Sequence, residues 1–484
     1  MLGRQSCNLT AAASEYRRRY GIEPPRGFEA WYYYAVAHAS PIIDEFDIIL
    51  ASLAPLFKLS GLQVREKMLA ASGVDGVDIW KCQFDGQTGE TRCSHPSRSG
   101  GHIQGTLGKW LEGAIGEMPG VEFLVNHLDE PRVMLPAADQ ATEHEEQIRV
   151  RDLSQQPIWD ELTKTCSRRQ GITATPGTSL SGDGVVTHGV PFVTDIRADK
   201  DLCQHPEYRE LHGMAMSPTT FLMVEGTVPI LTTGTTSTMG DVLFPSTAYE
   251  GEGGDGFTYD EASDMAWEKK RNNLYWAGST TGAYASDDGW KKYHRHRFVA
   301  LGRGLEGDRK HWYLRERNGF LQRIALPFFR RDLFDVAFTS AIQCRNDVCE
   351  SQRRYFDVQP RADKDAALGS KLVFDMDGNG ISGRFVKLLA SRSAVLKQTL
   401  LREWHDERLV PWVHYLPVSL GLGELPEMVA WLTGTEEGRR RAKAVADNGR
   451  EWAARAMRTE DRSIYMFRLM LELARLQDPE REAM

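Results

Sequence analysis

Apolar residues recur at helical spacing from residue 11 to residue 75, so this first part of the chain is predicted to be helical, with a break at Pro24 and Pro25. The run "VEFLV" at 121–125 is apolar and contains β-branched residues, which predicts a short buried strand. Residues 137–190 are polar and are predicted to be irregular. A helix is also expected at 105–115, and strands are expected at 219–224 and 228–231.

The stretch "EGEGGDG" at 250–256 is the most linker-like part of the chain, so we expect a domain boundary there. This boundary divides the sequence into residues 1–255 and 256–484. After it, short strands alternate with helices, a pattern typical of a doubly wound, mostly parallel sheet. The predicted strands are 273–277, 371–376, 393–397 and 412–418, and the predicted helices are 290–301, 384–390, 424–432, 437–457 and 462–476.

The segment "FDMDGNGISGRF" at 374–385 fits three binding motifs. A calcium loop that begins at Asp375 needs a bidentate Glu at its twelfth position, where Val386 stands, so this interpretation fails. The G-x-G-x-x-G pattern lies between a strand and a helix, but the next strand ends in Lys397 and not in the acid that holds a ribose. Asp375 and Asp377 also form the D-x-D pair that holds a metal ion in many sugar-nucleotide enzymes.

The part of this segment that keeps a physical role is its turn. Glycines between a strand and a helix let backbone N–H groups approach an anion, and the helix N-terminus favours negative charge. Arg384 stands at the predicted helix start, where it adds a charge-assisted contact to a diphosphate. Because Arg384 follows so closely, no structural metal ion is expected at Asp375. A tight turn with Arg384 on the surface is the structural alternative.

The composition bounds the class of protein. With 41% hydrophobic and 10% aromatic residues the chain is a folded globular protein, and 484 residues are enough for two or three domains. The net charge of −8 argues against a general nucleic-acid binder. The basic run Arg439-Arg440-Arg441 is predicted to be a solvated helix face.

Two observations concern the cellular compartment. No stretch approaches the ~20 apolar residues of a membrane-spanning helix, and no apolar signal segment follows Met1. A cytosolic protein fits this, and so does a chain that has been separated from an N-terminal anchor. Asn8-Leu9-Thr10 is a glycosylation acceptor sequence, which favours the lumen of the secretory pathway, in the ER or Golgi.

The seven cysteines favour the same compartment. They contain no C-x-x-C pair, which argues against a zinc site. A disulfide would close the polar turn between Cys344 and Cys349, and Cys82 and Cys93 flank another turn. The remaining cysteines are Cys166 and Cys203, in irregular segments, and Cys7, which is the odd one out.

Five segments resemble glycosyltransferase family 90, which contains the fungal capsule-associated xylosyltransferases and the animal protein O-glucosyltransferases. "SKLVFDMDGNGISGRFVKLLASRSAVLK" at 370–397, followed by "LVPWVHYLPV" at 409–418, is similar to the C-terminal half of that family. "WEKKRNNLYWAGSTTG" at 267–282 resembles its Trp-containing, Gly-Ser-Thr-rich segment. "DLCQHPEYRELHG" and "DVLFPS" resemble the fungal members, and the similarity extends from about residue 14 to residue 476.

This resemblance implies an α/β fold of the GT-B type, with two Rossmann-like domains that face each other across a cleft and helical extensions at both ends. It implies transfer of glucose or xylose from a UDP-sugar to a hydroxyl group of a glycan or protein acceptor, with inversion at the anomeric carbon. It implies no tightly bound cofactor and no required metal ion, and it leaves a loosely held Mn²⁺ ion open. No nucleic-acid partner is expected.

The expected catalytic base is Asp129. From the residues alone, Asp129 either faces a ligand beyond the strand at 121–125 or caps a turn before Pro131. The resemblance decides for the base, because Asp129-Glu130-Pro131 matches the catalytic Asp-x-Pro segment of the O-glucosyltransferases. A carboxylate in this position removes the proton of the acceptor hydroxyl group. Glu130 is the rival candidate.

The expected donor site lies in the C-terminal half. The resemblance implies that Arg384 meets the diphosphate and that Gly278 and Ser279 line the nucleotide cleft. Ala277 stands where family members often have Arg, so Arg295 or Arg297 is expected to contact the phosphates. The full predicted set is Gly278, Ser279, Thr280, Arg295, Arg297, Asp377, Gly380, Ser382 and Arg384, with Asp377 either touching the donor sugar or shaping the turn.

Three conspicuous side chains are given packing roles. His414 is interpreted as a satisfied core histidine on the predicted strand at 412–418, and Trp404 and Trp412 as packing residues. Two other functions stay open beside the transferase: a nicotinamide-dependent oxidoreductase, and a carbohydrate-binding relative without activity. The residues do not identify the donor sugar, the acceptor or the linkage, because small changes in a pocket decide these.

Overall fold

The computed structural model of the protein describes residues 2–74, 78–94, 101–136, 148–166, 190–251, 257–307, 309–328 and 330–484. The fold is mixed α/β and contains several sheets, one of them an all-parallel sheet of five strands. Most of the predicted irregular segment at 137–190, and residues 252–256 of the predicted linker, lie outside the described residues. The proposed boundary between residues 255 and 256 stays a prediction.

The predicted helical segment at the start of the chain is confirmed. It forms four α-helices whose ends follow local capping rules. The side chain of Asn8 accepts a hydrogen bond from the Ala11 N–H, and Ser60 and Gln63 form a capping box. Gly21 ends the first helix in the left-handed conformation. The helices are α1 (Leu9–Tyr20), α2 (Phe28–Ala37), α3 (Asp47–Leu53) and α4 (Gly61–Ser72).

The N-terminal half contains a five-stranded sheet in the order β2-β1-β3-β7-β8. The central strand β3 (Val121–Asn126) confirms the strand predicted at 121–125, and helix α5 (Gly101–Leu111) and the short 3₁₀ turn after it confirm the helix predicted before it. β3 is antiparallel to β1 and parallel to β7. The other strands are β1 (Ile79–Phe84), β2 (Thr91–Ser94), β7 (Ile230–Thr232) and β8 (Val242–Leu243).

A small sheet in the order β4-β6-β5 extends this half. Its central strand β6 (Leu222–Glu225) overlaps the strand predicted at 219–224. Its outer strands are β4 (Val133–Met134) and β5 (Arg149–Asp152), and three short helices lie nearby in the sequence, α6 (Trp159–Leu162), α7 (Ile196–Asp199) and α8 (Gly213–Met216).

The C-terminal half is built on the all-parallel sheet, in the order β12-β9-β13-β14-β15. In order of appearance along the chain this is 2-1-3-4-5, a doubly wound sheet as the alternation of strands and helices predicted. The strands are β9 (Arg271–Ser279), β12 (Phe334–Ser340), β13 (Ser370–Met376), β14 (Ala394–Gln398) and β15 (Leu416–Pro417). The helices are α9 (His294–Gly302), α10 (Asn346–Phe356), α11 (Phe385–Ala390), α12 (Leu425–Gly434) and α13 (Glu436–Ala456).

The predicted strand at 412–418 is wrong except for its end. Trp412 has a φ of 65°, in the left-handed region, and its N–H donates to Tyr415 O at 2.7 Å, so the chain turns here before β15. His414 is not in the core: it is half-buried, its Nδ1 accepts from Val410 N–H at 3.0 Å, and its ring stacks on Trp452. Trp404 is buried as predicted, whereas the Trp412 side chain is 38% exposed.

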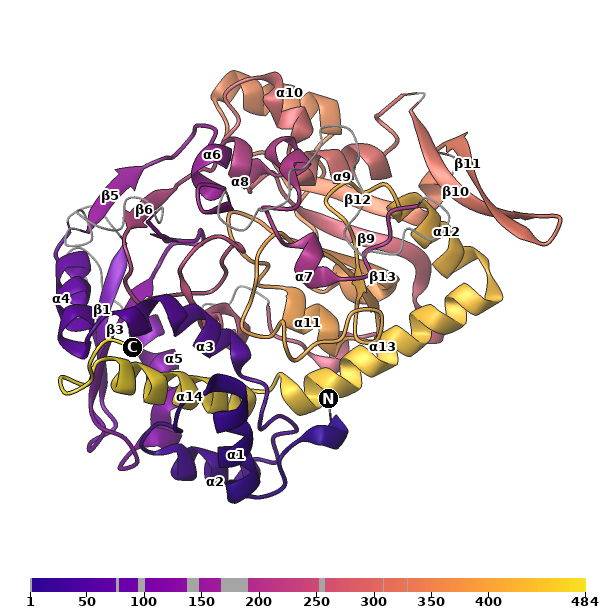
Figure 1. Ribbon diagram of the computed structural model, residues 1–484. Coiled ribbons are helices and arrows are strands. Elements are labelled where there is room, and N and C mark those ends of the chain that lie inside the picture. The colour runs from indigo at the N-terminus through magenta and orange to yellow at the C-terminus, as the bar shows by residue number, and fades with distance from the viewer. Residues whose placement is uncertain are drawn as a thin grey trace.

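A hairpin that the sequence analysis did not predict stands between α9 and β12. Its strands β10 (Lys310–Arg317) and β11 (Phe320–Pro327) pair only with each other among the described residues, and the hairpin projects from the body of the molecule (Figure 1). Asn318 and Gly319 both have positive φ at its tip, as a type I′ turn requires.

The last helix, α14 (Thr459–Leu476), returns to the N-terminal half, where it lies beside α1, α2 and α5 (Figure 1). Trp31 Nε1 donates to Ile464 O at 3.0 Å, and the Tyr465 hydroxyl donates to Leu243 O at 2.9 Å. Its Leu469 and Leu473 are buried in a core shared with β3. The helix therefore covers a face of the N-terminal half while its chain neighbours belong to the C-terminal half.

Three disulfides link Cys82 with Cys93, Cys166 with Cys203 and Cys344 with Cys349, and Cys7 is free and exposed. The turn at Cys344 is thus closed by a disulfide as predicted. In the part of the chain that the structure describes, no single helix has the length and apolar character needed to cross a membrane. One pair, Asp47–Lys58 with Gly61–Ser72, passes the length and composition test jointly but is bent by 100°.

Candidate active site

The carboxyl ends of β9 and β13 lie next to each other, at the point where the strand order of the parallel sheet reverses. In a doubly wound sheet the connections on the two sides of this point leave on opposite faces, so a crevice forms beyond the strand ends and ligands bind there. The loops at 280–287 and 377–384 leave the sheet at this point. Most of the predicted donor-binding residues therefore fall on one crevice.

Arg295, in the first turn of α9, joins these two loops. Its Nε donates to Asp377 O at 2.7 Å, and its Nη1 donates to Ser279 O at 3.1 Å and to Thr281 Oγ1 at 2.7 Å. The side chain is only 6% exposed. Burial, together with the positive charge of Arg384, lowers the pKa of Arg295 to about 9, so the guanidinium remains charged at neutral pH.

Arg384 lies at the start of α11 and reaches back to β9. Its Nη1 donates to Ala277 O at 2.6 Å, and its guanidinium carbon lies 5.8 Å from the centre of the Trp276 ring. A side chain at Gly278 would crowd this arrangement, because a Cβ there would lie 2.7 Å from the Trp276 ring and 3.4 Å from Arg384 Nη2. The predicted Gly278 and Arg384 are thus in direct proximity.

Two cations, the buried Arg295 and the partly buried Arg384, therefore lie near the crevice. Among the residues that the structure describes, neither Arg295 nor Arg384 forms an ion pair with a carboxylate, and both donate hydrogen bonds to carbonyl or hydroxyl oxygens. Burial lowers the pKa of Arg384 as well. Like charges in a poorly solvated place repel each other, and a bound anion relieves both the repulsion and the lost solvation. The crevice is built to receive negative charge.

A cavity of about 200 Å³ lies beside Arg384, between β9, β13 and α11. This volume is below the 300–1,000 Å³ typical of sites that enclose a whole ligand, so the cavity suits one planar group of a larger molecule. Its aromatic and charged lining residues include Tyr275, Trp276, Asp363, Lys364, Arg384 and Lys387.

The first carboxylate of the D-x-D pair is already engaged. Asp375 lies opposite Lys397 in the register of β13 and β14, and Asp375 Oδ2 lies 3.0 Å from Lys397 Nζ. Its Oδ1 accepts from Ser382 Oγ at 2.5 Å. Lys397 also pairs with Glu403 at 3.0 Å, and these two carboxylates raise its pKa against the effect of burial. Lys397, which stands where a dinucleotide-binding motif would have an acidic residue, thus neutralises the buried Asp375.

Asp377 is 1% exposed, and its Oδ2 accepts from Leu400 N–H at 2.7 Å. His294 Nδ1 accepts a hydrogen bond from Gly213 N–H, so the proton of the neutral ring is on Nε2. His294 Nε2 therefore donates to the backbone oxygen of Asp377, 3.0 Å away. Burial lowers the pKa of His294 far below its usual value, so the ring is neutral. The ring of His212 stacks on it at 3.9 Å. These contacts shape the turn after β13; a contact of Asp377 with the donor sugar stays a prediction.

Asp129 lies just after β3, and its backbone faces the loop after β13. A Cβ added to Gly380 would lie 2.0 Å from Asp129 O, so the two chain segments are in contact. The Asp129 side chain is accessible to solvent, yet the surrounding protein raises its pKa by desolvation, an effect that electrostatic interaction with His127 and Arg295 opposes. The structure thus brings the predicted base to the predicted donor site.

Glu130, the rival candidate, is turned inward. It is 3% exposed, its Oε1 accepts from Thr220 Oγ1 at 2.8 Å, and burial raises its pKa. Its backbone oxygen accepts from Asn126 Nδ2. This environment gives Glu130 a structural place behind the surface on which Asp129 lies.

The remaining predicted residues are only partly brought together. Ser279 Oγ forms a hydrogen bond with Thr281 Oγ1 at the crevice. Thr280 is buried, and its Oγ1 exchanges hydrogen bonds with the backbone of Ile342. Arg297 lies elsewhere: its Nη1 and Nη2 donate to Leu420 O and Gly421 O. Sequence analysis missed His212, His294 and Asn379, whose Oδ1 accepts from Gly282 N–H at 3.0 Å.

Within the described residues, no group of three or more His, Cys, Asp and Glu side chains is arranged to hold a metal ion. The expectation that no metal ion is required, with a loosely held Mn²⁺ ion left open, stays a prediction.

Comparison with known proteins gives the class. Residues 307–483 match the glycosyl transferase family 90, a region that runs from β10 to the end of the chain and includes Arg384. The chain therefore carries a glycosyltransferase family 90 domain, as the sequence motifs indicated. Arg295 and Asp129 lie before the matched region.

Two curated relatives are similar to a shorter part of the chain. Over 108 residues the chain is 31% identical to protein O-glucosyltransferase 2 of Danio rerio, and over 108 residues it is 31% identical to protein O-glucosyltransferase 3 of Mus musculus. Each alignment covers 22% of this chain and 21% of the relative. The chain thus matches about a fifth of the length of these curated relatives, which is a distant similarity.

Proposed function

We propose that the protein is an inverting glycosyltransferase that moves glucose or xylose from a UDP-sugar to a hydroxyl group of a glycan or protein acceptor. One observation carries this proposal. The guanidinium carbons of Arg295 and Arg384 lie 5.7 Å and 5.8 Å from the Trp276 ring centre, at the reversal point of the parallel sheet and without an ion-pair partner among the described residues, and Asp129 lies against the loop after β13. Cations for a diphosphate and a carboxylate for a hydroxyl proton are the two requirements of this transfer.

The two sheets support a GT-B arrangement. The doubly wound sheet supplies the donor side, and the sheet that contains β3 supplies the acceptor side with Asp129 at a strand end. The contact between Asp129 and Gly380 joins the two sides at one cleft. In this arrangement the parallel sheet forms the Rossmann-like donor half, whereas the sheet that contains β3 is mixed, because β1 runs antiparallel to β3.

The chemical step needs one proton acceptor and one leaving group. The Asp129 carboxylate takes the proton of the acceptor hydroxyl group while the hydroxyl oxygen forms a bond to the anomeric carbon of the donor sugar. The bond between that carbon and the diphosphate oxygen breaks, and its electron pair leaves with UDP. Attack opposite to the leaving group inverts the anomeric configuration.

The charge that develops on UDP is stabilised by groups already in place. Arg384 and Arg295 are held by hydrogen bonds to backbone oxygens, so they do not reorganise during the reaction. The nucleobase occupies the cavity beside Arg384, between Tyr275 and Lys387. Metal assistance is not required in this scheme, because the two cations offset the diphosphate charge.

The proposed site of action is the lumen of the secretory pathway. Three disulfides are stable in an oxidising compartment, and the similarity to protein O-glucosyltransferases supports the same location. A glycan or protein acceptor in that lumen, and a UDP-sugar, are the proposed partners.

A thermal-shift panel with UDP-glucose, UDP-xylose, UDP-galactose, UDP and NAD tests the proposal. A ligand that binds only the folded protein raises Tm, by an amount that grows with its concentration over Kd. We expect UDP and one UDP-sugar to raise Tm, and UDP release to follow when acceptor is added. Stabilisation by NAD alone would identify an oxidoreductase, and sugar-nucleotide binding without release or transfer would identify an inactive relative.

A further inference from the structure

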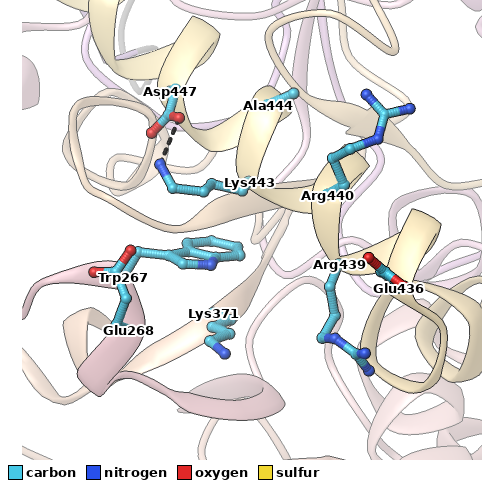
Figure 2. A pocket seen from close by; sticks show the side chains of 9 residues that line it. All are labelled: Trp267, Glu268, Lys371, Glu436, Arg439, Arg440, Lys443, Ala444 and Asp447. Carbon is cyan, nitrogen blue, oxygen red and sulfur yellow. Dashed lines mark hydrogen bonds and ion pairs between the residues drawn. The ribbon is translucent and has the colours of Figure 1, made fainter.

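A second pocket lies at the other end of the parallel sheet. It has a volume of about 660 Å³ and is formed by the turn before β9, the start of β13 and the first turns of α13 (Figure 2). Lys371 in this pocket and Asp377 at the crevice are six residues apart along β13 and the residue after it, which corresponds to about 20 Å. The pocket is therefore separate from the proposed donor site.

Two cations in this pocket have no ion-pair partner among the residues that the structure describes. These are Lys371 and Arg439, both of which line the pocket (Figure 2). Their neighbours differ: Lys443 pairs with Asp447 at 2.7 Å, and Arg440 pairs with Glu437 at 2.6 Å. On a chain whose net charge is −8, two unpaired cations facing one hollow form a local site for negative charge.

The rest of the lining suits a ligand with many hydroxyl groups. The indole of Trp267 is half-buried and packed against the core, so its position is fixed, and Lys371 Nζ lies 5.7 Å from the centre of its ring. Carboxylates accept hydrogen bonds and ammonium groups donate them, and a hydroxyl group does both. The acidic lining residues are Glu268, Glu436 and Asp447.

We propose that this pocket binds an anionic sugar residue of a glycan. The apolar face of the pyranose ring lies against Trp267, whose ring face carries partial negative charge and attracts C–H groups. The carboxylate or phosphate group of the sugar is held by Lys371 and Arg439 through charge-assisted hydrogen bonds. The hydroxyl groups pair with the acidic side chains of the rim. This site goes beyond the proposed function, because binding here needs neither UDP nor transfer.

The test is isothermal titration calorimetry of the full chain with a hyaluronan tetrasaccharide, which carries carboxylates, and with glucose 6-phosphate, which carries a phosphate. These two arms distinguish the two sources of charge. We expect binding of at least one of them, weakened about tenfold or more by the double substitution Lys371→Gln/Arg439→Gln. Trp267→Ala should weaken binding of the same probe by a similar factor.

Arg441→Gln is the matched control, because Arg441 is on the same helix, pairs with Glu437 and lies outside the pocket lining. It removes one positive charge and should leave binding unchanged. The double variant changes the half-buried Lys371 and the exposed Arg439, neither of which has an ion-pair partner among the described residues, so it tests the site even where Trp267→Ala fails to fold. The UDP-induced change in Tm, measured on the same variants, should not alter, which separates this site from the donor site.

Four results would overturn the proposal. They are no binding of either anionic sugar, equal binding of neutral cellotetraose, equal binding of inorganic phosphate without dependence on Trp267, and equal binding of a poly-glutamate peptide. The last result would identify a site for acidic proteins. If the parent protein binds an anionic sugar but not UDP, the proposed function would be contradicted and the anionic-sugar site would stand.

Discussion

The backbone oxygen of Asp129 lies against Gly380, so close that a Cβ atom on Gly380 would be 2.0 Å away from it. The loop after β13 and the end of β3 thus touch without a side chain between them. This backbone contact holds Asp129 in a fixed position relative to the proposed donor site.

Gly380→Ala should reduce transfer activity strongly. The added methyl group pushes the two loops apart, and a displacement of about 1 Å at a reacting group can lower kcat by about 100-fold. Steady-state kinetics with the donor identified by the thermal-shift panel measure this effect. Gly434→Ala is the control, because a Cβ at Gly434 meets no atom within 4 Å. Equal activity of the two variants would contradict the functional importance of the contact.

Asp129→Asn should lower kcat by roughly 10²–10⁴-fold, the usual contribution of a general base, and leave the affinity for UDP nearly unchanged. Because desolvation raises the pKa of Asp129, the activity of the parent protein should fall as pH decreases through a value above that of an ordinary Asp. Glu130→Gln is the control and should retain activity, since Glu130 is turned inward against Thr220. An active Asp129→Asn protein would rule out this base.

Lys397→Met should destabilise the protein by about 3 kcal/mol or more, because it leaves buried carboxylates without their cation. The matched exposed pair is Lys443 with Asp447, and Lys443→Met should cost less than about 1 kcal/mol. Urea unfolding of both variants gives the comparison. A similar decrease in the free energy of unfolding in the two variants would show that the buried ion pair stabilises the protein no more than the exposed one.

Glu407 should make the protein less stable as the pH rises. Burial raises its pKa to about 7 in the folded state, against 4.5 for an ordinary Glu. The folded state thus binds this proton more tightly than the unfolded state does. Protonated Glu407 therefore makes its full contribution to folding stability below about pH 4.5, and this contribution is lost as the pH rises to about 7.

Measurements of Tm between pH 5 and pH 8 test this titration. The Gln side chain of Glu407→Gln stays neutral at every pH and still accepts from Ile48 N–H. Between pH 5 and pH 8 the parent protein should lose stability on the order of 2 kcal/mol, and the variant should not show this loss. A parent and variant with the same pH dependence of Tm would contradict the assignment to Glu407.

Asn8 should carry an N-linked glycan when the protein is made in a eukaryotic secretory pathway. Asn8-Leu9-Thr10 is the only such acceptor sequence in the chain, and Asn8 is exposed with its Oδ1 bound to Ala11 N–H. Treatment with a peptide N-glycosidase should therefore increase electrophoretic mobility. Thr10→Ala destroys the acceptor sequence but keeps the helix cap, and it should abolish the shift. A parent protein without a shift would contradict secretory glycosylation at this position.

The sequence predicted the doubly wound sheet because its strands are buried on both faces and appear as short apolar runs, as in 371–376. It did not predict β4 and β8, which have two residues each and depend on neighbouring strands. The hairpin at β10 and β11 was missed although Asn318-Gly319 is a hairpin signal between two runs of strand-forming residues.

A site residue could be predicted where a sequence motif places it close to the loop at which it acts. Arg384 is an example, because it directly follows the glycine turn after β13. Arg295 and Arg297 stood equal in the sequence, yet residues two apart on a helix point in different directions, so the fold brought one to the crevice and the other to Leu420. The stack of His212 on His294 joins residues far apart in sequence, and only the tertiary structure reveals it.

The position of α14 has a consequence for biosynthesis. The ribosome adds roughly 5–20 residues per second, so about 20 to 70 s pass between the completion of β3 and the appearance of α14. During this interval the apolar face that α14 covers in the folded protein is exposed, and such surfaces are the ones that chaperones bind. A nascent chain that ends before Thr459 exposes this face permanently, which marks it for degradation by the quality control of its compartment.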